Sequence, residues 1–355
     1  MTVTHVPKST GKMLSHDECI VFQDRFLEDV SRTFALTIPQ LPPPLYLAVG
    51  NAYLLCRIAD TIEDEPKLTP EQKTAFSEWF NEVVKGTREP DEFADKLTGE
   101  LSSATKQGEK ELIASTHQVV QITHGFTPAQ RQAIERCVEI MTKGMGQFQQ
   151  NAGISGLKDL SELDHYCYCV AGVVGEMLTD LFCEYSPEIA NNREELLDLA
   201  IQFGQGLQMT NILKDVWDDR QRGICWLPRE VFQKYGIELD TVKPTEPGLS
   251  SGIHDLVAIA HRHLQGALRY ILTIPSNETG IRQHCLSALG MAVLTLKRVK
   301  NNPEFTNGNE VKISRRSVKL ILFVTQLLVR SNLGLKLLFT VLMFDFRGLQ
   351  QPDKT

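Results

Sequence analysis

Two acidic motifs on otherwise apolar segments constrain the fold of this chain more than any other feature. The first contains Asp60, Glu63 and Asp64, whose spacing of three and four residues places the three carboxyl groups on one face of a helix. Carboxylates gathered in this way repel one another unless a cation lies among them. Taken alone, the motif leaves two interpretations open: an acidic helix end running into Pro66, or a functional site.

The same spacing recurs in the second half of the chain, at Asp215, Asp218 and Asp219. Asn211 and Gln208 precede Asp215 by one and two helical turns, on the same face. Two such faces opposed across a helix bundle would offer the oxygen ligands that Mg²⁺ prefers, and Mg²⁺ in proteins usually binds few carboxylates together with substrate phosphates. The two motifs together therefore predict a magnesium-diphosphate site. The predicted metal ligands are Asp60, Glu63, Asp64, Asn211, Asp215 and Asp219.

A diphosphate that leaves its ester as an ion leaves a carbocation behind. Mg²⁺ and nearby cations would neutralise the departing group, and an apolar cavity would keep water from the cation. Asp60, Asp64, Asp215 and Asp219 are accordingly the predicted catalytic carboxylates. The residues near the motifs that we expect to contact diphosphate are Arg57, Gln208, Lys214, Arg220 and Arg222.

The chain is predicted to fold as one large all-α domain around a cavity. Apolar residues recur three and four positions apart, as between Leu196 and Leu207, while strand patterns, repeats and linkers are scarce. We expect the domain to cover residues 15–345, with loose tails at 1–14 and 346–355. The polar interval Gly86–Gly108 is predicted to be a loop.

Composition narrows the partners and the compartment. The net charge of −7 argues against a nucleic-acid binder, which usually has a basic domain or stripe. The eight cysteines form no CxxC pair, so they are expected to be free thiols in a reducing compartment. Met1–Lys12 lacks the apolar core of a targeting peptide. These features predict a cytoplasmic protein.

The most apolar part of the chain is C-terminal, in the segments Leu320–Val329 and Leu333–Phe344. A membrane span needs about 20 mostly apolar residues, and Arg330 and Lys336 interrupt this stretch. A true span is therefore not expected. Two interpretations remain open: a buried pair of core helices, or a peripheral contact with a membrane surface.

Four segments resemble the head-to-head trans-isoprenyl diphosphate synthases, known as the squalene/phytoene synthase family. They are Ser31–Phe34, Ala59–Glu65, Asp164–Gly175 and Gln208–Asp219, the last followed by Trp226–Pro228. The resemblance implies an isoprenoid-synthase fold and a transferase that joins two molecules of farnesyl diphosphate with Mg²⁺. It also implies that Ser31 and Arg32 contact diphosphate, and that Tyr166 transfers a proton or stabilises a cation. His165 is expected to be structural, because it points about 100° away on a helix.

Within that family, Val311–Arg316 resembles the basic element that the squalene-forming branch places near a nicotinamide cofactor, although Ser314 stands where arginine is common. The resemblance thus implies presqualene diphosphate as an intermediate and NADPH as the reductant. The implied cofactor contacts are Arg32, Arg57, Lys312, Arg315 and Arg316. Because no GxGxxG follows a strand, NADPH would lie at the cavity mouth and not in a Rossmann site.

Three alternatives stay open. The basic element could be an ordinary solvated charge cluster. The enzyme could be a relative that needs no reductant and makes dehydrosqualene, hydroxysqualene or phytoene. It could also be an inactive family member that serves in assembly or lipid binding, although the acids of both motifs are all present.

Overall fold

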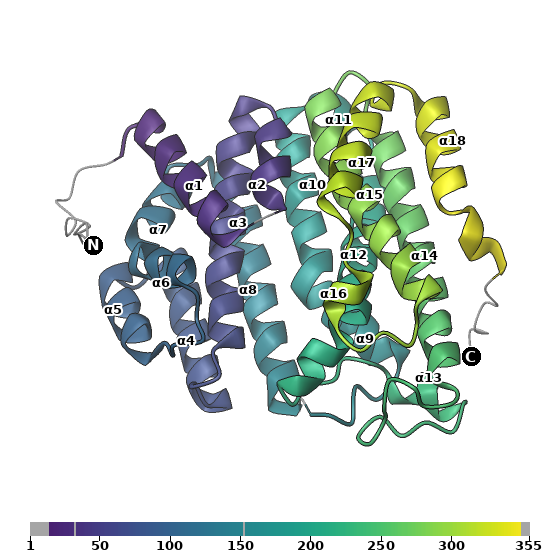
Figure 1. Cartoon of the computed structure of the whole chain (residues 1–355). Helices are drawn as coiled ribbons and strands as arrows, with labels where there is room; N and C mark the ends of the chain where they lie inside the picture. Colours follow the sequence, from purple (N-terminus) through teal and green to yellow (C-terminus); the bar gives the residue numbers. More distant parts are fainter. Residues whose placement is uncertain (1–13, 32, 152, 349–355) are drawn as a thin grey trace.

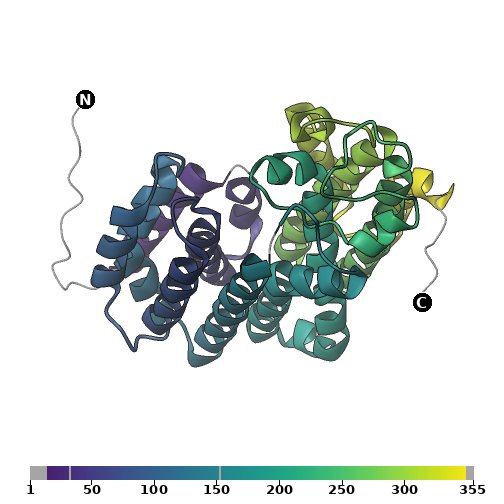
Figure 2. The same ribbon diagram turned by 90° about the horizontal axis from the view of Figure 1, so that it is seen from below.

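The computed structural model describes residues 14–31, 33–151 and 153–348, and helices form nearly all of its regular structure. Within these ranges no strand occurs, and Leu157 and Pro228 form an isolated bridge. Figures 1 and 2 show helices packed into one body, with the N-terminal segments on one side and the C-terminal segments on the other. The predicted all-α fold is confirmed. The predicted tails, 1–14 and 346–355, lie almost wholly outside the described residues.

Long helices near the middle of the body supply most of the cavity wall. They are α3 (Pro43–Asp64), α8 (Pro128–Asn151), α9 (Leu160–Cys167), the π-helical turn η2 (Tyr168–Gly172), α10 (Val173–Tyr185), α12 (Arg193–Gln221), α14 (Leu249–Thr273) and α15 (Thr279–Asn301).

Shorter elements cover both sides. The N-terminal ones are α1 (His16–Val30), α2 (Phe34–Thr37), η1 (Ile38–Gln40), α4 (Pro70–Val84), α5 (Pro90–Glu100), α6 (Gln107–Ala114) and α7 (Thr116–His124). The later ones are α11 (Pro187–Ala190), α13 (Arg229–Gln233), α16 (Gly308–Val311), α17 (Arg315–Leu328), α18 (Asn332–Leu342) and η3 (Phe344–Gly348).

The prolines of the sequence mark where helices begin. Pro43, Pro70, Pro90 and Pro128 are each the first residue of a helix. Proline is tolerated there because its fixed φ suits a helix and its missing N–H would have no helical partner. These four prolines therefore separate successive helices of the N-terminal half.

The prediction of a loop at Gly86–Gly108 is wrong. Pro90–Glu100 forms helix α5, and another helix begins at Gln107. The segment is polar, but Phe93, Ala94 and Leu97 lie on one face and are buried. A narrow apolar face is enough to hold a short helix against the rest of the protein. The high polarity of the whole segment hides this face when the sequence is read alone.

Close backbone contact fixes the centre of the bundle. Gly175 of α10 lies against the carbonyl oxygen of Ala200 in α12, and Gly204 of α12 lies against that of Ala171. A Cβ atom at either glycine would overlap with these oxygens. These two contacts bring α12 directly onto the α9–η2–α10 helix.

One stretch of the described chain, Leu160–Tyr185, is long and apolar enough to cross a membrane by length and composition, and half of its most apolar window is buried. It contains η2 and packs on α8 and α12. The C-terminal apolar stretch forms two helices of 14 and 11 residues, α17 and α18, interrupted at Val329–Ser331.

Candidate active site

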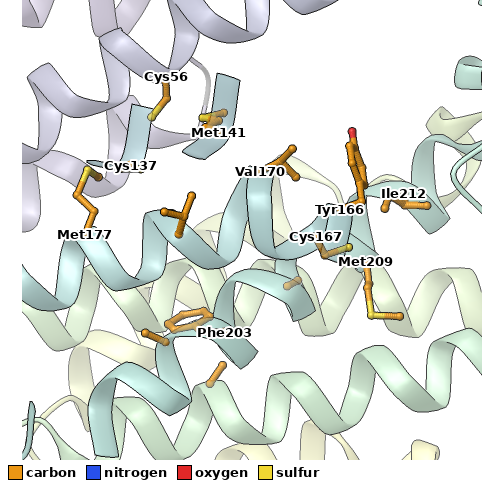
Figure 3. Packing of buried hydrophobic residues seen from close by; sticks show 14 of the residues in the cluster. Cys56, Cys137, Met141, Tyr166, Cys167, Val170, Met177, Phe203, Met209 and Ile212 are labelled. Carbon is orange, nitrogen blue, oxygen red and sulfur yellow. The ribbon is translucent and has the colours of Figure 1, made fainter. Parts of the chain in front are cut away.

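A cavity of about 550 Å³ lies among α3, α8, the α9–α10 helix, α12 and α15. Its volume falls in the usual range for small-molecule sites. Figure 3 shows part of the apolar packing around it, with Tyr166 and Val170 projecting from the same side of their helix. The apolar lining includes Phe34, Met141, Met145, Val170, Val174, Met177, Leu178, Phe182, Phe203, Leu207 and Trp226.

The two acidic motifs meet at this cavity. Most of the site residues expected from the sequence line it, namely Arg57, Asp60, Glu63, Asp64, Tyr166, Gln208, Asn211, Lys214, Asp215, Asp219 and Arg222. The first motif occupies the last turn of α3, and the second occupies the last two turns of α12. Carboxylates there oppose the negative pole of the helix dipole, so this placement costs stability and favours a bound cation.

Arg222 joins the two motifs directly. Its Nη1 donates to Asp64 Oδ1 at 3.0 Å, and its Nη2 donates to Asp219 Oδ1 at 2.5 Å. One guanidinium therefore spans the gap between α3 and α12 and partly offsets the repulsion between their carboxylates. Because one side chain contacts both Asp64 and Asp219, the two acid faces lie opposite each other within the reach of a guanidinium group.

Burial and mutual repulsion raise the pKa values of the acids. Loss of solvation is the largest cause for each of three groups. It raises the pKa of Asp60 to about 7 and that of Glu63 to about 8, and it raises the pKa of Asp219. Neighbouring carboxylates add to each increase. Asp60 nevertheless keeps 32% of its side chain accessible, because it faces the cavity, so water moderates its shift.

The donor set suits a hard divalent cation. Oε1 of Glu63 is buried and has no hydrogen-bond partner within the described structure. The facing groups are carboxylate and amide oxygens, which Mg²⁺ prefers. Among residues 14–31, 33–151 and 153–348, no three acidic, His or Cys side chains converge into a preformed metal site. The residues present therefore fit Mg²⁺ that completes its coordination with oxygens of a substrate.

Positive charge surrounds the acids. Arg57 contacts Asp60 at 3.5 Å and Glu109 at 2.5 Å, so it is shared between the motif and a neighbouring helix. Lys214 lies 2.9 Å from Asp215. The mouth thus combines anionic ligands for a cation with cationic donors for an anion, which is the arrangement that a metal-diphosphate complex requires.

Tyr166 stands where the polar mouth meets the apolar wall. Its ring stacks on Trp226 with centroids 4.1 Å apart and meets Phe148 edge-on at 5.1 Å. Burial, and next the charge of Glu63, raise the pKa of its hydroxyl well above the usual value. That hydroxyl makes no hydrogen bond to any residue that the structure describes. The helix widens into the π-helical turn η2 two residues later, a distortion often found at functional sites.

Other predicted residues lie elsewhere. Ser31 Oγ accepts a hydrogen bond from the backbone N–H of Phe34 at 2.9 Å, and Ser31 is not part of the cavity wall. Arg32 lies outside the described residues. Lys312, Arg315 and Arg316 are exposed and do not line the cavity.

A short link connects the basic element to the second motif. Gly308 of α16 lies against the carboxylates of Asp215 and Asp218, and a Cβ atom there would be 3.0 Å from an Asp218 oxygen. The chain reaches Lys312 four residues later. The basic element is therefore separated by only a few residues of sequence from a segment at the cavity mouth, although none of its basic side chains lines the cavity wall.

The sequence did not point to several residues that support the site. Gln149 Nε2 donates to the backbone carbonyl of Glu63 at 2.9 Å, and Lys73 donates to the same oxygen. Glu109 Oε1 accepts a hydrogen bond from Arg57 Nη2. These contacts join segments that are far apart along the chain, so helical spacing gave no signal for them. His165 is exposed and does not line the cavity, as expected.

Comparisons with known proteins agree with this geometry. A family model described as squalene/phytoene synthase matches residues 27–317. Squalene synthase of Saccharomyces cerevisiae is 30% identical over 291 residues, which is 80% of this chain and 62% of that protein. The Gibberella zeae enzyme is 30% identical over 304 residues, covering 84% of this chain and 62% of its own length. The chain thus spans less than two thirds of these relatives.

Solved structures share the fold. TcSQS in complex with the ligand BPH1237 has a TM-score of 0.73 and 23% identity, covering 96% of this chain and 94% of its own. A dehydrosqualene synthase in complex with a ligand has a TM-score of 0.66 and 19% identity, covering 89% and 98%. At these identities the likeness concerns the fold alone, and it confirms the isoprenoid-synthase type expected above.

The raised pKa of Glu63 makes a prediction about the metal-free protein. The folded state keeps a proton up to about pH 8, whereas the unfolded chain releases it near pH 4.3. Stability should therefore fall as pH rises between these values. Glu63→Gln does not titrate, so in urea unfolding it should exceed wild type by about 1 kcal/mol or more above pH 8 and match it at about pH 4, below the pKa of the unfolded chain.

Glu238→Gln, at an exposed position, is the matched control and should leave the pH profile unchanged. If the difference between Glu63→Gln and wild type is the same at both ends of the pH range, the carboxyl of Glu63 is not held in its protonated form.

Proposed function

The chain belongs to the squalene/phytoene synthase family, and on this premise we propose that it is a prenyltransferase of isoprenoid biosynthesis. It condenses two molecules of farnesyl diphosphate head to head into presqualene diphosphate, and then forms squalene with NADPH. The observation that carries the proposal is the pair of acid motifs, joined by Arg222, at the mouth of an apolar cavity. Residues 15–345 act as one functional unit.

The acidic motifs hold the metal in this proposal. Asp60 and Asp64 on α3 and Asp215 and Asp219 on α12 are the principal ligands, with Glu63 and Asn211 completing the set. When bound, Mg²⁺ supplies positive charge that stabilises diphosphate as it leaves. Gathering buried carboxylates costs electrostatic free energy, as the raised pKa values of Asp60 and Glu63 indicate. A divalent cation would relieve this cost.

The basic side chains bind the diphosphate oxygens. Arg57 and Lys214 each already contact a carboxylate of the mouth, and Gln208 offers an amide N–H donor. Arg222 is half exposed at 56% and reaches both motifs. It would exchange a carboxylate contact for a diphosphate contact when substrate enters, so that the charges stay balanced throughout.

The cavity wall protects the cation that remains. Its aromatic members, including Phe182, Phe203 and Trp226, carry π-electrons that attract positive charge and offer no nucleophile. Exclusion of water keeps the cation from ending as an alcohol before the second farnesyl chain reacts. Tyr166 lines this boundary, and its hydroxyl is placed to accept or return a proton, or to stabilise the cation.

In the second half-reaction NADPH would supply a hydride. We assign its phosphate contacts to Lys312, Arg315 and Arg316, together with Arg57 at the mouth and with Arg32, which lies outside the described residues. The position of Gly308 against the second acid motif supports this assignment, because it brings the chain leading to Lys312 near the mouth.

A second candidate is a relative that uses no reductant and releases dehydrosqualene, hydroxysqualene or phytoene. The exposure of Lys312, Arg315 and Arg316 outside the cavity wall favours it. An inactive member is disfavoured, because every metal-ligand acid is retained and lines one cavity.

Tyr166→Phe separates chemistry from packing. The substitution keeps the ring stacked on Trp226 and removes a hydroxyl that has no described hydrogen-bond partner. We expect the turnover rate to fall at least about 100-fold, as for loss of a proton-transfer group, with little change in melting temperature. Product formation from farnesyl diphosphate and a thermal melt measure the two effects.

Tyr270→Phe is the matched control. The Tyr270 hydroxyl is buried and lies 2.9 Å from Thr179 Oγ1, so its loss should cost about 1 kcal/mol of stability and affect turnover far less. Equal losses of activity and stability in Tyr166→Phe would make Tyr166 a packing residue.

Product analysis with and without NADPH tests the proposed product. Wild type should make squalene with NADPH, and presqualene diphosphate or rearranged alcohols without it. The double variant Lys312→Ala with Arg315→Ala should raise the apparent KM for NADPH about tenfold and leave the first half-reaction intact, because contacts to a remote phosphate act equally in ground and transition states.

Lys96→Ala with Lys234→Ala removes two exposed cations far along the chain from the basic element and should change neither half-reaction. The same product with and without NADPH would identify the reductant-free branch. Squalene formation with an unchanged KM in the double variant would remove Lys312 and Arg315 from the cofactor site.

A further inference from the structure

Two buried acidic residues beside the cavity have no place in the proposed metal site. Among the residues that the structure describes, three acidic residues are buried: Glu65, Glu109 and Asp219. Asp219 lines the cavity and belongs to the second motif, whereas Glu65 and Glu109 are not part of the cavity wall. Burying a carboxylate costs free energy unless the group is paired and hydrogen-bonded. The partners of these two residues therefore indicate what they do.

Glu65 ties the end of α3 to the segment that leads into α6. It is the residue directly after α3. Its Oε1 accepts a hydrogen bond from the backbone N–H of Lys67 at 3.0 Å, and its Oε2 accepts one from the backbone N–H of Ser102, also at 3.0 Å. The hydroxyl of Thr105 donates to the same Oε2. Both carboxylate oxygens are thus used to hold the start of α6 against the end of α3.

Glu109 makes two separate contacts at the start of α6, which lies beside α3 (Figure 1). Its Oε2 accepts a hydrogen bond from the backbone N–H of Lys106 at 3.3 Å, which caps the first turn of the helix. Its Oε1 accepts one from Arg57 Nη2 at 2.5 Å, and Lys106 Nζ lies 3.3 Å from the same oxygen. The start of a helix also favours negative charge. Helix α6 therefore fixes the carboxylate that Arg57 of α3 reaches.

Arg57 is shared unequally between two carboxylates. Its Nη2 lies 2.5 Å from Glu109 Oε1, whereas its Nη1 lies 3.5 Å from Asp60 Oδ2. Charge-assisted hydrogen bonds of this kind are usually about 2.7–2.9 Å long, so the contact with Asp60 is loose. Nε of Arg57 is buried and has no hydrogen-bond partner among the described residues. The guanidinium is therefore bound closely by Glu109 and only weakly by Asp60.

The unequal sharing leaves Asp60 available to a cation. Residues three apart on a helix are close enough to pair, and a guanidinium can bind one carboxylate through two parallel hydrogen bonds. Such a pair between Arg57 and Asp60 would occupy the oxygens that the proposed metal needs. Glu109 competes for the same guanidinium and keeps it from closing on Asp60. Arg57 nevertheless remains in the cavity wall.

We propose that Glu109 is a positioning residue, whose carboxylate draws Arg57 toward α6 so that Asp60 remains available to Mg²⁺ and Arg57 to diphosphate. Glu65 supports the arrangement by holding the start of α6 in place. The inference rests on the proposed function, because that function assigns the metal to Asp60 and the diphosphate to Arg57. It adds a residue that lies 52 positions along the chain from Arg57 and outside the cavity wall.

Glu109→Gln tests the inference. Glutamine can also cap a helix at this position, so the substitution removes the charge that holds Arg57 and keeps the start of α6. We expect the Kd of inorganic diphosphate in the presence of Mg²⁺, measured by calorimetry, to rise about ten- to hundredfold. At saturating Mg²⁺ and farnesyl diphosphate, kcat should fall much less, because Asp60 and Arg57 are both retained. Thermal melts should show a folded protein.

Glu18→Gln is the matched control, because Glu18 holds the same capping position at the start of α1 and does not line the cavity. It should leave the Kd unchanged. A second comparison starts from Arg57→Gln. Because Glu109 acts through Arg57, adding Glu109→Gln to that variant should weaken diphosphate binding by less than about twofold further. A role in folding alone would produce the same loss with and without Arg57.

An unchanged Kd in Glu109→Gln would overturn the inference while leaving the proposed function in place. So would an equal loss of binding in the wild-type and Arg57→Gln backgrounds, because Glu109 would then act through the fold and not through Arg57. Wild-type protein that shows no Mg²⁺-dependent binding of diphosphate would contradict the proposed function itself, and the inference would fall with it.

Discussion

Repulsion among carboxylates at the mouth of an apolar cavity is the constraint on which the rest of the structure depends. Helices α3 and α12 end there with acids in their last turns, where both burial and the helix dipole disfavour negative charge. Arg222 and Arg57 offset part of that cost. The remaining repulsion is a cost that a bound divalent cation would relieve.

The sequence was sufficient to predict which acids share a helix face, because helical spacing determines it. Asp60 was paired with Asp64, and Asp215 with Asp219, for that reason, and all four line the cavity. Contacts between distant segments could not be predicted in the same way. The bridge made by Arg222 depends on how two helix ends approach each other, which no local pattern records.

The errors have equally local causes. Helix α5 was missed because only a few apolar residues on one face hold it in place. At the C-terminus, hydropathy left a buried helix pair and a membrane-facing pair as alternatives, since counting apolar residues does not tell which side each one faces. In the structure one side of α17 and of α18 packs on the core and the other side is exposed.

The most direct test of the account is whether the two acid motifs act as one site. Binding of inorganic diphosphate in the presence of Mg²⁺ can be measured by calorimetry for Asp60→Asn, Asp215→Asn and the double variant. If the motifs do act as one site, each single variant should lose Mg²⁺-dependent binding, and with it turnover of farnesyl diphosphate, as completely as the double variant, while the melting temperature is retained. Near wild-type binding and turnover in either single variant would contradict it.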